Sequence, residues 1–459
     1  MYRDGEKRIL LVVASLASFL VPYTVSSLNV ALPAISASFD IDAVMLGWVT
    51  SAYLLTAAIC IVPFGKLADM YGRKRFFILG NVLFAIGSLL AAIAWSGHVI
   101  STARVIQALG GAMVFSTSIA IVTSVFPPGE RGRAIGIITA TVYAGLSLGP
   151  FIGGVLTYNI GWPAIFLVNI PLAILVIVLT MLYIPGEWKE TTERRFDLTG
   201  VALYGLTLFG CIYGLTLLPS HSGIFWMLLG LGVLGLFIWW EQRVAAPLVE
   251  IALFRKRPVF LYSNIAALIN YAMVFAVGFL LSLYLQYNRG IDPQTTGLIL
   301  IAQPVIQMII SPVAGHLSDR VEPRVLATVG MVCSTAGLGI LMFLSPGTPL
   351  VVIIGGQVIL GLGYGLFSSP NTNAIMSSVE VRYLGLASSM VSTMRAIGQM
   401  LSLAIAMLVF SAVIGSVPIT PEVYPELQQS VNIAFMIFFA LGLVGIVASY
   451  ARGKGRKDS

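Results

Sequence analysis

Charged residues are scarce in this chain of 459 residues. Only 10% are Asp, Glu, Lys or Arg, whereas a soluble globular protein carries about 25%. Hydrophobic residues make up 58% of the sequence. The low charge excludes a soluble protein and predicts a membrane protein with many spans.

Reactive side chains are equally few. Cys60, Cys211 and Cys333 lie in apolar stretches without metal-ligand spacing, so we expect them to pack as small hydrophobic residues. The three histidines lie near the ends of separate apolar stretches. No Gly-x4-Gly-Lys-Ser/Thr loop is present, so ATP does not drive the protein. We therefore expect no catalytic site, no metal and no cofactor.

The formal net charge of +7 does not indicate a nucleic-acid partner. The cations lie in short connections between apolar stretches and form no basic face. We expect the lipid bilayer to be the main surroundings of this protein.

Fourteen apolar stretches are each near the ~20 residues that span a bilayer as a helix. They lie at roughly 8–33, 45–65, 76–96, 99–126, 134–158, 163–184, 198–219, 223–241, 258–287, 295–317, 325–345, 349–376, 384–414 and 430–450. The first stretch is too long for a signal-peptide core and no small-residue cleavage site follows it, so we expect an uncleaved span.

The connections between these stretches alternate in charge. The cationic set contains Arg73 to Arg75, Arg131, Arg133, Lys189, Arg194, Arg195, Arg255 to Arg257, Arg320, Arg324, Arg382 and both termini. The other set contains Asp40, Asp42, His98, His221, Asp292, Glu422, Glu426 and one cation, Arg289. The positive-inside rule places the cationic set in the cytoplasm. We therefore expect a multi-pass protein of the cell membrane with both termini cytoplasmic.

The connection from Gly65 to Arg75 reads Gly-x-Leu-x-Asp-x-x-Gly-Arg-Lys-Arg. It resembles the signature loop between spans 2 and 3 of the major facilitator superfamily of transporters. The chain also repeats itself: Gly315 to Arg320 echoes this loop, and Gln357 to Gly363 echoes Arg104 to Gly110. Two such echoes in the same order argue for an internal duplication.

The resemblance implies an all-α polytopic membrane protein with two six-helix bundles and two inserted central helices. We expect bundles at 1–184 and 258–459, with the inserted pair at 185–257. Fourteen spans with the extra pair in the middle resemble the drug/proton antiporter branch of the superfamily.

The resemblance also implies a conformational latch at the loop between spans 2 and 3. Its candidate residues are Gly65, Asp69, Gly72, Arg73 and Glu130. The Asp69 carboxylate would favour the positive N-terminal end of a helix in the other half, and the thirteenth span is the expected partner. Such a latch would hold the cytoplasmic side shut.

The fifth span carries a glycine pattern that resembles the antiporter motif of the superfamily, which marks exporters. Its residues are Gly136, Gly145, Gly149, Pro150, Gly153 and Gly154. Glycines that recur every fourth residue form a small stripe on which a neighbouring helix approaches closely, and a proline can bend the helix. The alternative is ordinary small-residue packing.

Arg104 lies in the fourth apolar stretch, within a run that resembles the span-4 motif of the superfamily. There the arginine is tied to proton coupling. A cation at bilayer depth is costly, so we expect Arg104 to face the protein interior or a water-filled cavity. The alternative is that it snorkels to the nearer membrane surface. Arg395 in the thirteenth stretch is a second in-membrane cation.

Relatives of this branch usually carry an aspartate in the first span, but Thr24 occupies that position here. No Asp or Glu lies clearly at mid-bilayer, which weakens the inferences of cationic substrates and of proton coupling. The remaining candidates for a substrate cavity are aromatic or polar: Tyr23, Thr24, Asn29, Trp48, Tyr53, Tyr143, Asn270, Gln303, Gln307, Asn371, Asn373 and Gln399. Such a set suits amphipathic, neutral or anionic molecules. Each residue fits helix packing equally well.

These observations predict a secondary-active exporter of hydrophobic or amphipathic compounds that exchanges them for protons and works as a monomer. Its partners would be a small-molecule substrate and protons. One alternative is an exporter or facilitator of a single metabolite without proton coupling. Another is a membrane receptor or scaffold that kept the fold and lost transport.

Overall fold

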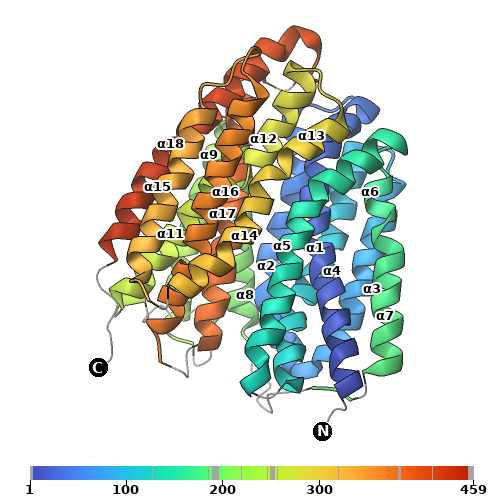
Figure 1. The fold of residues 1–459 in the computed structure, drawn as a ribbon, viewed down its shortest axis with the longest axis vertical. Coiled ribbons are helices and arrows are strands. Elements are labelled where there is room, and N and C mark those ends of the chain that lie inside the picture. Colours follow the sequence, from blue (N-terminus) through green and yellow to red (C-terminus); the bar gives the residue numbers. More distant parts are fainter. Residues whose placement is uncertain are drawn as a thin grey trace. The chain divides into compact units, whose positions relative to one another are not determined.

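The computed structural model describes residues 4–126, 128–184, 186–188, 196–218, 220–244, 247–248, 254–255, 257–318, 320–380, 384–415 and 417–452. Within these residues, fourteen helical stretches are long and apolar enough to cross a membrane. The predicted all-α fold and the number of spans are confirmed. The chain forms two compact units, each built from long helices (Figure 1).

The first unit comprises residues 1–41, 48–196 and 292–298. Its helices are α1 (Asp4–Phe39), α2 (Ala43–Tyr71), α3 (Arg73–Ala92), α4 (Gly97–Val125), α5 (Pro128–Asn159), α6 (Ala164–Leu167) and α7 (Asn169–Tyr183). The first residues of α2, 43–47, belong to the second unit. α1 packs most extensively against α5, and α3 against α4. A buried apolar core between α1, α3, α4, α5 and α7 includes Phe77 and Val122.

The second unit comprises residues 42–47, 197–291 and 299–459. Its first helices are α8 (Leu198–Leu217), α9 (His221–Glu241), α11 (Pro258–Val274), α12 (Val277–Leu283) and the π-helical turn η1 (Tyr284–Asn288). They are followed by α13 (Pro293–Leu300), whose first residues belong to the first unit, and by α14 (Ala302–Leu317), α15 (Pro323–Leu341), α16 (Leu350–Ser377), α17 (Leu384–Val413), the 3-10 turn η3 (Pro421–Val423) and α18 (Tyr424–Ala451). The expected inserted helices α8 and α9 pack on one another, and α8 also packs against α17.

The internal duplication is visible in how two helix pairs approach. A Cβ added to Gly110 in α4 would meet the backbone of α3 at Gly80 and Phe84. A Cβ added to Gly363 in α16 would likewise meet the backbone of α15 at Gly330 and Ser334. Gly110 and Gly363 close the two echoing sequence runs. The repeated glycine therefore serves the same close helix contact in each unit.

Several helices begin at residues whose side chains accept a hydrogen bond from the first turn, as N-caps do. Ser96 caps α4 and Asp197 caps α8. Asp42 accepts from the backbone N–H of Met45 at 2.6 Å, and Asp292 accepts from that of Thr295 at 2.9 Å. The hydrogen bond from the Thr295 backbone lowers the pKa of Asp292, because it favours the charged carboxylate.

Some expected boundaries are wrong in detail. α1 runs from Asp4 to Phe39 although it contains Pro22 and Pro33, so it is longer than the apolar stretch at 8–33. The final helix begins at Tyr424, earlier than expected at 430. Polar residues extend both helices at their N-terminal ends, and α1 also continues through the mixed segment from Ala34 to Phe39.

Candidate functional site

The turn between α2 and α3 is a single residue, Gly72. Its φ angle of 125° lies in a region that side chains disfavour. A Cβ at this position would also lie 2.5 Å from the Cδ of Glu187. The positive φ angle therefore favours glycine here, and a side chain would also require Glu187 to move.

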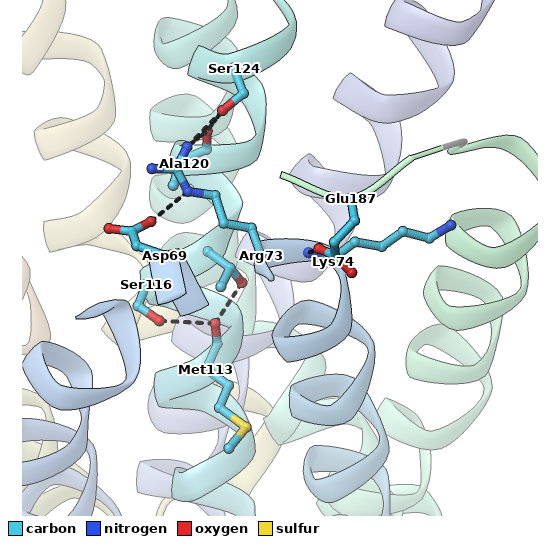
Figure 2. Close-up of polar contacts among 9 residues, drawn as sticks. Asp69, Arg73, Lys74, Met113, Ser116, Ala120, Ser124 and Glu187 are labelled. Carbon is cyan, nitrogen blue, oxygen red and sulfur yellow. Dashed lines mark hydrogen bonds and ion pairs between the residues drawn. The ribbon is translucent and has the colours of Figure 1, made fainter. Parts of the chain in front are cut away.

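Arg73, the first residue of α3, is buried with 5% of its surface exposed. Its Nε donates to Oδ1 of Asp69 at 2.6 Å, and its Nη1 donates to Oγ of Ser124 at 2.7 Å and to the carbonyl of Ala120 at 3.2 Å (Figure 2). The guanidinium thus links the end of α2 to the last turns of α4. A carboxylate and two neutral oxygens offset the cost of burying this charge.

Glu187 belongs to the segment that follows α7, and it completes the same turn. Its Oε1 accepts from the backbone N–H of Lys74 at 2.8 Å, and its Oε2 lies 3.5 Å from Nε of Arg75. The backbone carbonyl of Trp188 accepts from the N–H of Arg73 at 3.0 Å. The first two N–H groups of α3 lack partners within their own helix. The segment after α7 supplies both acceptors and so caps α3.

Sequence reasoning did not find Glu187. The connection after the sixth span also contains Glu190 and Glu193, and no local pattern distinguishes one acid from the others. Only the path of the chain back to Gly72 shows which acid caps α3. The same path explains why Lys74 donates from Nζ to the carbonyl of Ile184 at 2.5 Å.

The structure brings together part of the predicted latch. Asp69 and Arg73 form an ion pair next to Gly72, and a Cβ added to Gly65 would lie 3.7 Å from Cβ of Ser116 in α4. The side chain of Glu130 lies outside the described residues. The predicted partner of Asp69, the thirteenth span, belongs to the other unit and stays a prediction.

Three glycines of the α5 motif face the backbone of α1. An added Cβ would lie 2.6 Å from the carbonyl oxygen of Phe19 at Gly145, 3.1 Å from the Ser27 nitrogen at Gly149 and 2.7 Å from the Ser27 oxygen at Gly153. Ser26 donates from Oγ to the carbonyl of Gly145 at 3.2 Å. The two helices therefore touch along their backbones, a distance that only glycine permits.

The other two glycines of the motif have surroundings different from those of the first three. A Cβ added to Gly154 would lie 2.5 Å from the carbonyl oxygen of Pro293, and one added to Gly297 would meet the carbonyl oxygen of Pro150. These residues join α5 to the first turns of α13, within the first unit. A Cβ added to Gly136 meets no atom within 4 Å. The motif thus has two packing faces and one open position.

Arg104 in α4 is fully buried. Its Nε donates to the carbonyl of Val49 at 3.3 Å, and its Nη1 donates to Oε1 of Gln107 at 2.5 Å. Nε2 of Gln107 in turn donates to Oγ of Ser88 at 2.7 Å. The guanidinium lies 4.3 Å from the ring centroid of Tyr53. The cation therefore faces the protein interior, as expected, and the snorkelling alternative does not describe this structure.

Arg395 in α17 contacts a tyrosine as well. Its Nε donates to the hydroxyl of Tyr271 in α11 at 3.1 Å, and its guanidinium lies 5.2 Å from the ring centroid of Tyr271. Tyr271 in turn packs edge-on against Tyr364 in α16, with 5.7 Å between centroids. Tyr271 of α11 therefore links Arg395 of α17 to Tyr364 of α16.

The residues predicted to line a substrate cavity differ in their contacts and burial. Three amides take part in polar helix contacts within the second unit: Asn270 contacts Sδ of Met331, Asn371 donates to the carbonyl of Ser263, and Asn373 donates to Oγ of Ser318. Tyr23 stacks on Phe19 in α1, and Tyr53 lies under Arg104. The other candidates are buried or partly exposed on their helices: Thr24, Asn29, Trp48, Tyr143, Gln303, Gln307 and Gln399. Among the described residues, no three His, Cys, Asp or Glu side chains come close enough to hold a metal ion.

Comparison with known proteins assigns the chain to a family. The sequence matches the profile of the Major Facilitator Superfamily over residues 14–403 and 263–457. The chain belongs to the major facilitator superfamily. It is therefore a multi-pass membrane transporter of small molecules.

Two relatives show the range within this family. The chain is 35% identical over 404 residues to the multidrug resistance protein Stp of Mycobacterium tuberculosis strain CDC 1551 / Oshkosh, covering 86% of this chain and 74% of the relative. It is 32% identical over 393 residues to the riboflavin transporter RibZ of Clostridioides difficile strain 630, covering 85% of both chains. A solved bacterial homolog of the human lysosomal transporter Spinster has the same fold, with a TM-score of 0.73, 15% identity and 98% coverage of both chains.

Proposed function

We propose that this major facilitator is a secondary-active efflux transporter that exports hydrophobic or amphipathic compounds by alternating access. The observation that carries the proposal is the glycine face of α5, where Gly145, Gly149 and Gly153 lie against the backbone of α1. The sequence resemblance associates this motif with exporters. The similarity to a multidrug resistance protein over 86% of the chain supports the same assignment.

The α2–α3 turn is the proposed latch of the transport cycle. Its cation, Arg73, is buried and oriented by Asp69 and Ser124, so the turn is a rigid element. A rigid turn can present the partly exposed Asp69 carboxylate to a helix terminus of the other bundle. Making and breaking that contact would alternate access to the cavity.

Proton exchange is the energy source that the resemblance to drug/proton antiporters implies. Arg104 would act in it by shifting the titration of a neighbouring group, because arginine itself stays protonated. The second candidate is transport of a single metabolite without proton coupling. One observation favours it: every Asp and Glu within the helices lies in the first or last six residues of its helix. The 32% sequence identity to a riboflavin transporter is consistent with transport of a single metabolite.

The transporter would lie in the cell membrane with both termini in the cytoplasm, since the cationic connections favour that orientation. It would work as a monomer. Residues 1–184 and 258–459 would form the two moving bundles, and 185–257 would form the inserted pair.

The test is transport by the purified protein in liposomes, assayed with a panel of aromatic compounds of different charge. Each compound is assayed with no gradient, with an imposed pH gradient and with an imposed membrane potential. We expect gradient-dependent movement of amphipathic members of the panel. Dependence on the pH gradient supports antiport, and movement without such dependence supports the second candidate. A protein that moves no compound under any condition contradicts the efflux function.

A further inference from the structure

Within the helices that the structure describes, two cations lie far from the helix ends and no acid does. Arg104 is the eighth residue of α4, and Arg395 is the twelfth residue of α17. All other Lys, Arg, Asp and Glu residues within the helices lie in the first or last six residues. The interior of the spans therefore carries positive charge without a carboxylate from the chain at the same depth. Charged residues inside a membrane protein mark sites for ions or substrates by default.

Arg104 is a poor candidate for direct contact with a solute. It is fully buried, and neutral groups of its own unit surround it: the Val49 carbonyl, the Gln107 amide and the Tyr53 ring. A solute could reach this guanidinium only after the helices separated. Its role toward a ligand is that of a fixed positive charge.

Arg395 is placed differently. It is partly exposed and lies about 17 Å along α17 from Leu384, at ~1.5 Å per residue. Tyr271 orients the guanidinium through a hydrogen bond at Nε of 3.1 Å. One turn further along α17, a Cβ added to Gly398 would lie 2.6 Å from the Leu268 carbonyl oxygen and 2.6 Å from Cβ of Tyr271. α17 and α11 are therefore in close contact at this level, and the cation is held in a defined position.

We propose that Arg395, oriented by Tyr271, binds the negatively charged group of the transported molecule. The substrate would be an amphipathic organic anion with an aromatic body and a carboxylate, sulfonate or phosphate group. The guanidinium fork matches such groups with two parallel hydrogen bonds. The partly exposed ring of Tyr364, which packs edge-on against the buried Tyr271, offers an aromatic surface for the body of the molecule.

The inference rests on the proposed efflux function and explains its most unusual feature. A cationic drug would need a buried carboxylate, and the spans provide none at depth. An anion needs the opposite charge, which Arg395 provides. A membrane potential that is negative inside also favours the outward movement of an anion. Export of such a substrate therefore requires no titrating acid in the spans.

The first test is ligand binding by the purified full-length protein. Three probes share one ring system and differ in fixed charge: pyrene-1-sulfonate, 1-pyrenemethanol and (1-pyrenylmethyl)trimethylammonium. Pyrene fluorescence reports each dissociation constant. We expect the sulfonate to bind most tightly and Arg395→Gln to weaken it at least about tenfold, the loss typical of a charge-assisted pair. Arg395→Lys should weaken it less, and Tyr271→Phe should weaken it about threefold.

Controls separate charge recognition from damage to the fold. Arg243→Gln removes one exposed cation at the end of α9 and should leave sulfonate binding unchanged. Binding of the neutral 1-pyrenemethanol should change less than twofold in Arg395→Gln, which shows that the aromatic surface is intact. Tighter binding of the ammonium probe, or equal sulfonate affinity in Arg395→Gln and Arg243→Gln, would overturn the anion site.

The second test is movement of the same probes in liposomes. A negative-inside potential should accelerate sulfonate efflux in the wild type and not in Arg395→Gln. Sulfonate binding that depends on Arg395, with no probe moved, would contradict the efflux function and leave the anion site standing. Efflux of the ammonium probe alone would support efflux and overturn the anion site.

Discussion

Nε of Arg73 lies 2.6 Å from Oδ1 of Asp69, although the two residues belong to different helices. Gly72 alone separates α2 from α3, and its positive φ angle turns the chain so that the two side chains meet. The signature loop is therefore folded around an internal ion pair. That pair sets where the Asp69 carboxylate points.

We expect Asp69→Asn to weaken the closed latch. The amide keeps the size of the carboxylate but loses its charge, and a charge-assisted hydrogen bond is worth about 1.5–3 kcal/mol. Arg73 retains Ser124 and Ala120 as partners, so the fold should survive. The measurement is labelling of a cysteine introduced at Tyr143 in α5, after the three native cysteines are replaced. Labelling from the predicted cytoplasmic side should accelerate. Unchanged labelling together with unchanged transport would count against the latch.

Glu187→Ala should destabilise the protein by about 1 kcal/mol, the usual cost of losing a helix cap. Glu187→Gln should lose less, because the amide oxygen still accepts from the Lys74 N–H. The readout is thermal unfolding of the purified protein. Arg75→Ala is the matched control, since Arg75 is exposed and such surface pairs contribute little. If Glu187→Ala unfolds at the same temperature as Arg75→Ala, the capping role assigned to Glu187 is wrong.

The α5 motif allows a test within one helix. We expect Gly149→Val and Gly153→Val to abolish transport, because each adds volume where α5 touches the α1 backbone. Gly136→Val should be tolerated, since a Cβ there meets no atom within 4 Å. All three variants should insert into the membrane, because valine suits a membrane helix. The comparison is efflux at equal amounts of inserted protein. Normal efflux by both Gly149→Val and Gly153→Val would contradict a functional role of this contact.

Thr24→Asp should increase the pH dependence of transport or extend it to cationic compounds. Thr24 is buried in α1 with 1% exposed, so the substitution would place a carboxylate inside the span. The control is Asp40→Asn combined with Asp42→Asn, which should change little. Asp42 accepts a hydrogen bond from the Met45 N–H, and asparagine caps a helix equally well.

The assay for this prediction is efflux from vesicles at several imposed pH gradients. A steep gradient dependence in the natural protein that disappears in the Asp40/Asp42 double variant would show that these two acids lie on the coupling path.

The fold class and the number of spans could be predicted from the sequence. Apolar stretches of about 20 residues admit one solution in a bilayer, because every backbone polar group must be paired within its own helix. The signature loop and its echo near Gly315 were sufficient to suggest the family, since they depend on residue order alone. The small residues of α5 were also visible as a stripe, because helical periodicity places Gly145, Gly149 and Gly153 on one face.

The partners of these residues could not be predicted in this way, because they come from distant parts of the chain. Sequence order does not show that α1 is the helix against the α5 glycines, nor that Glu187 returns to cap α3. The sequence also left open whether Arg104 reaches the membrane surface or the protein interior, because the guanidinium can find polar partners in either place. The backbone of α2 and the ring of Tyr53 settle that choice by enclosing the guanidinium. Contacts between residues far apart in the chain depend on packing in three dimensions, which local patterns do not specify.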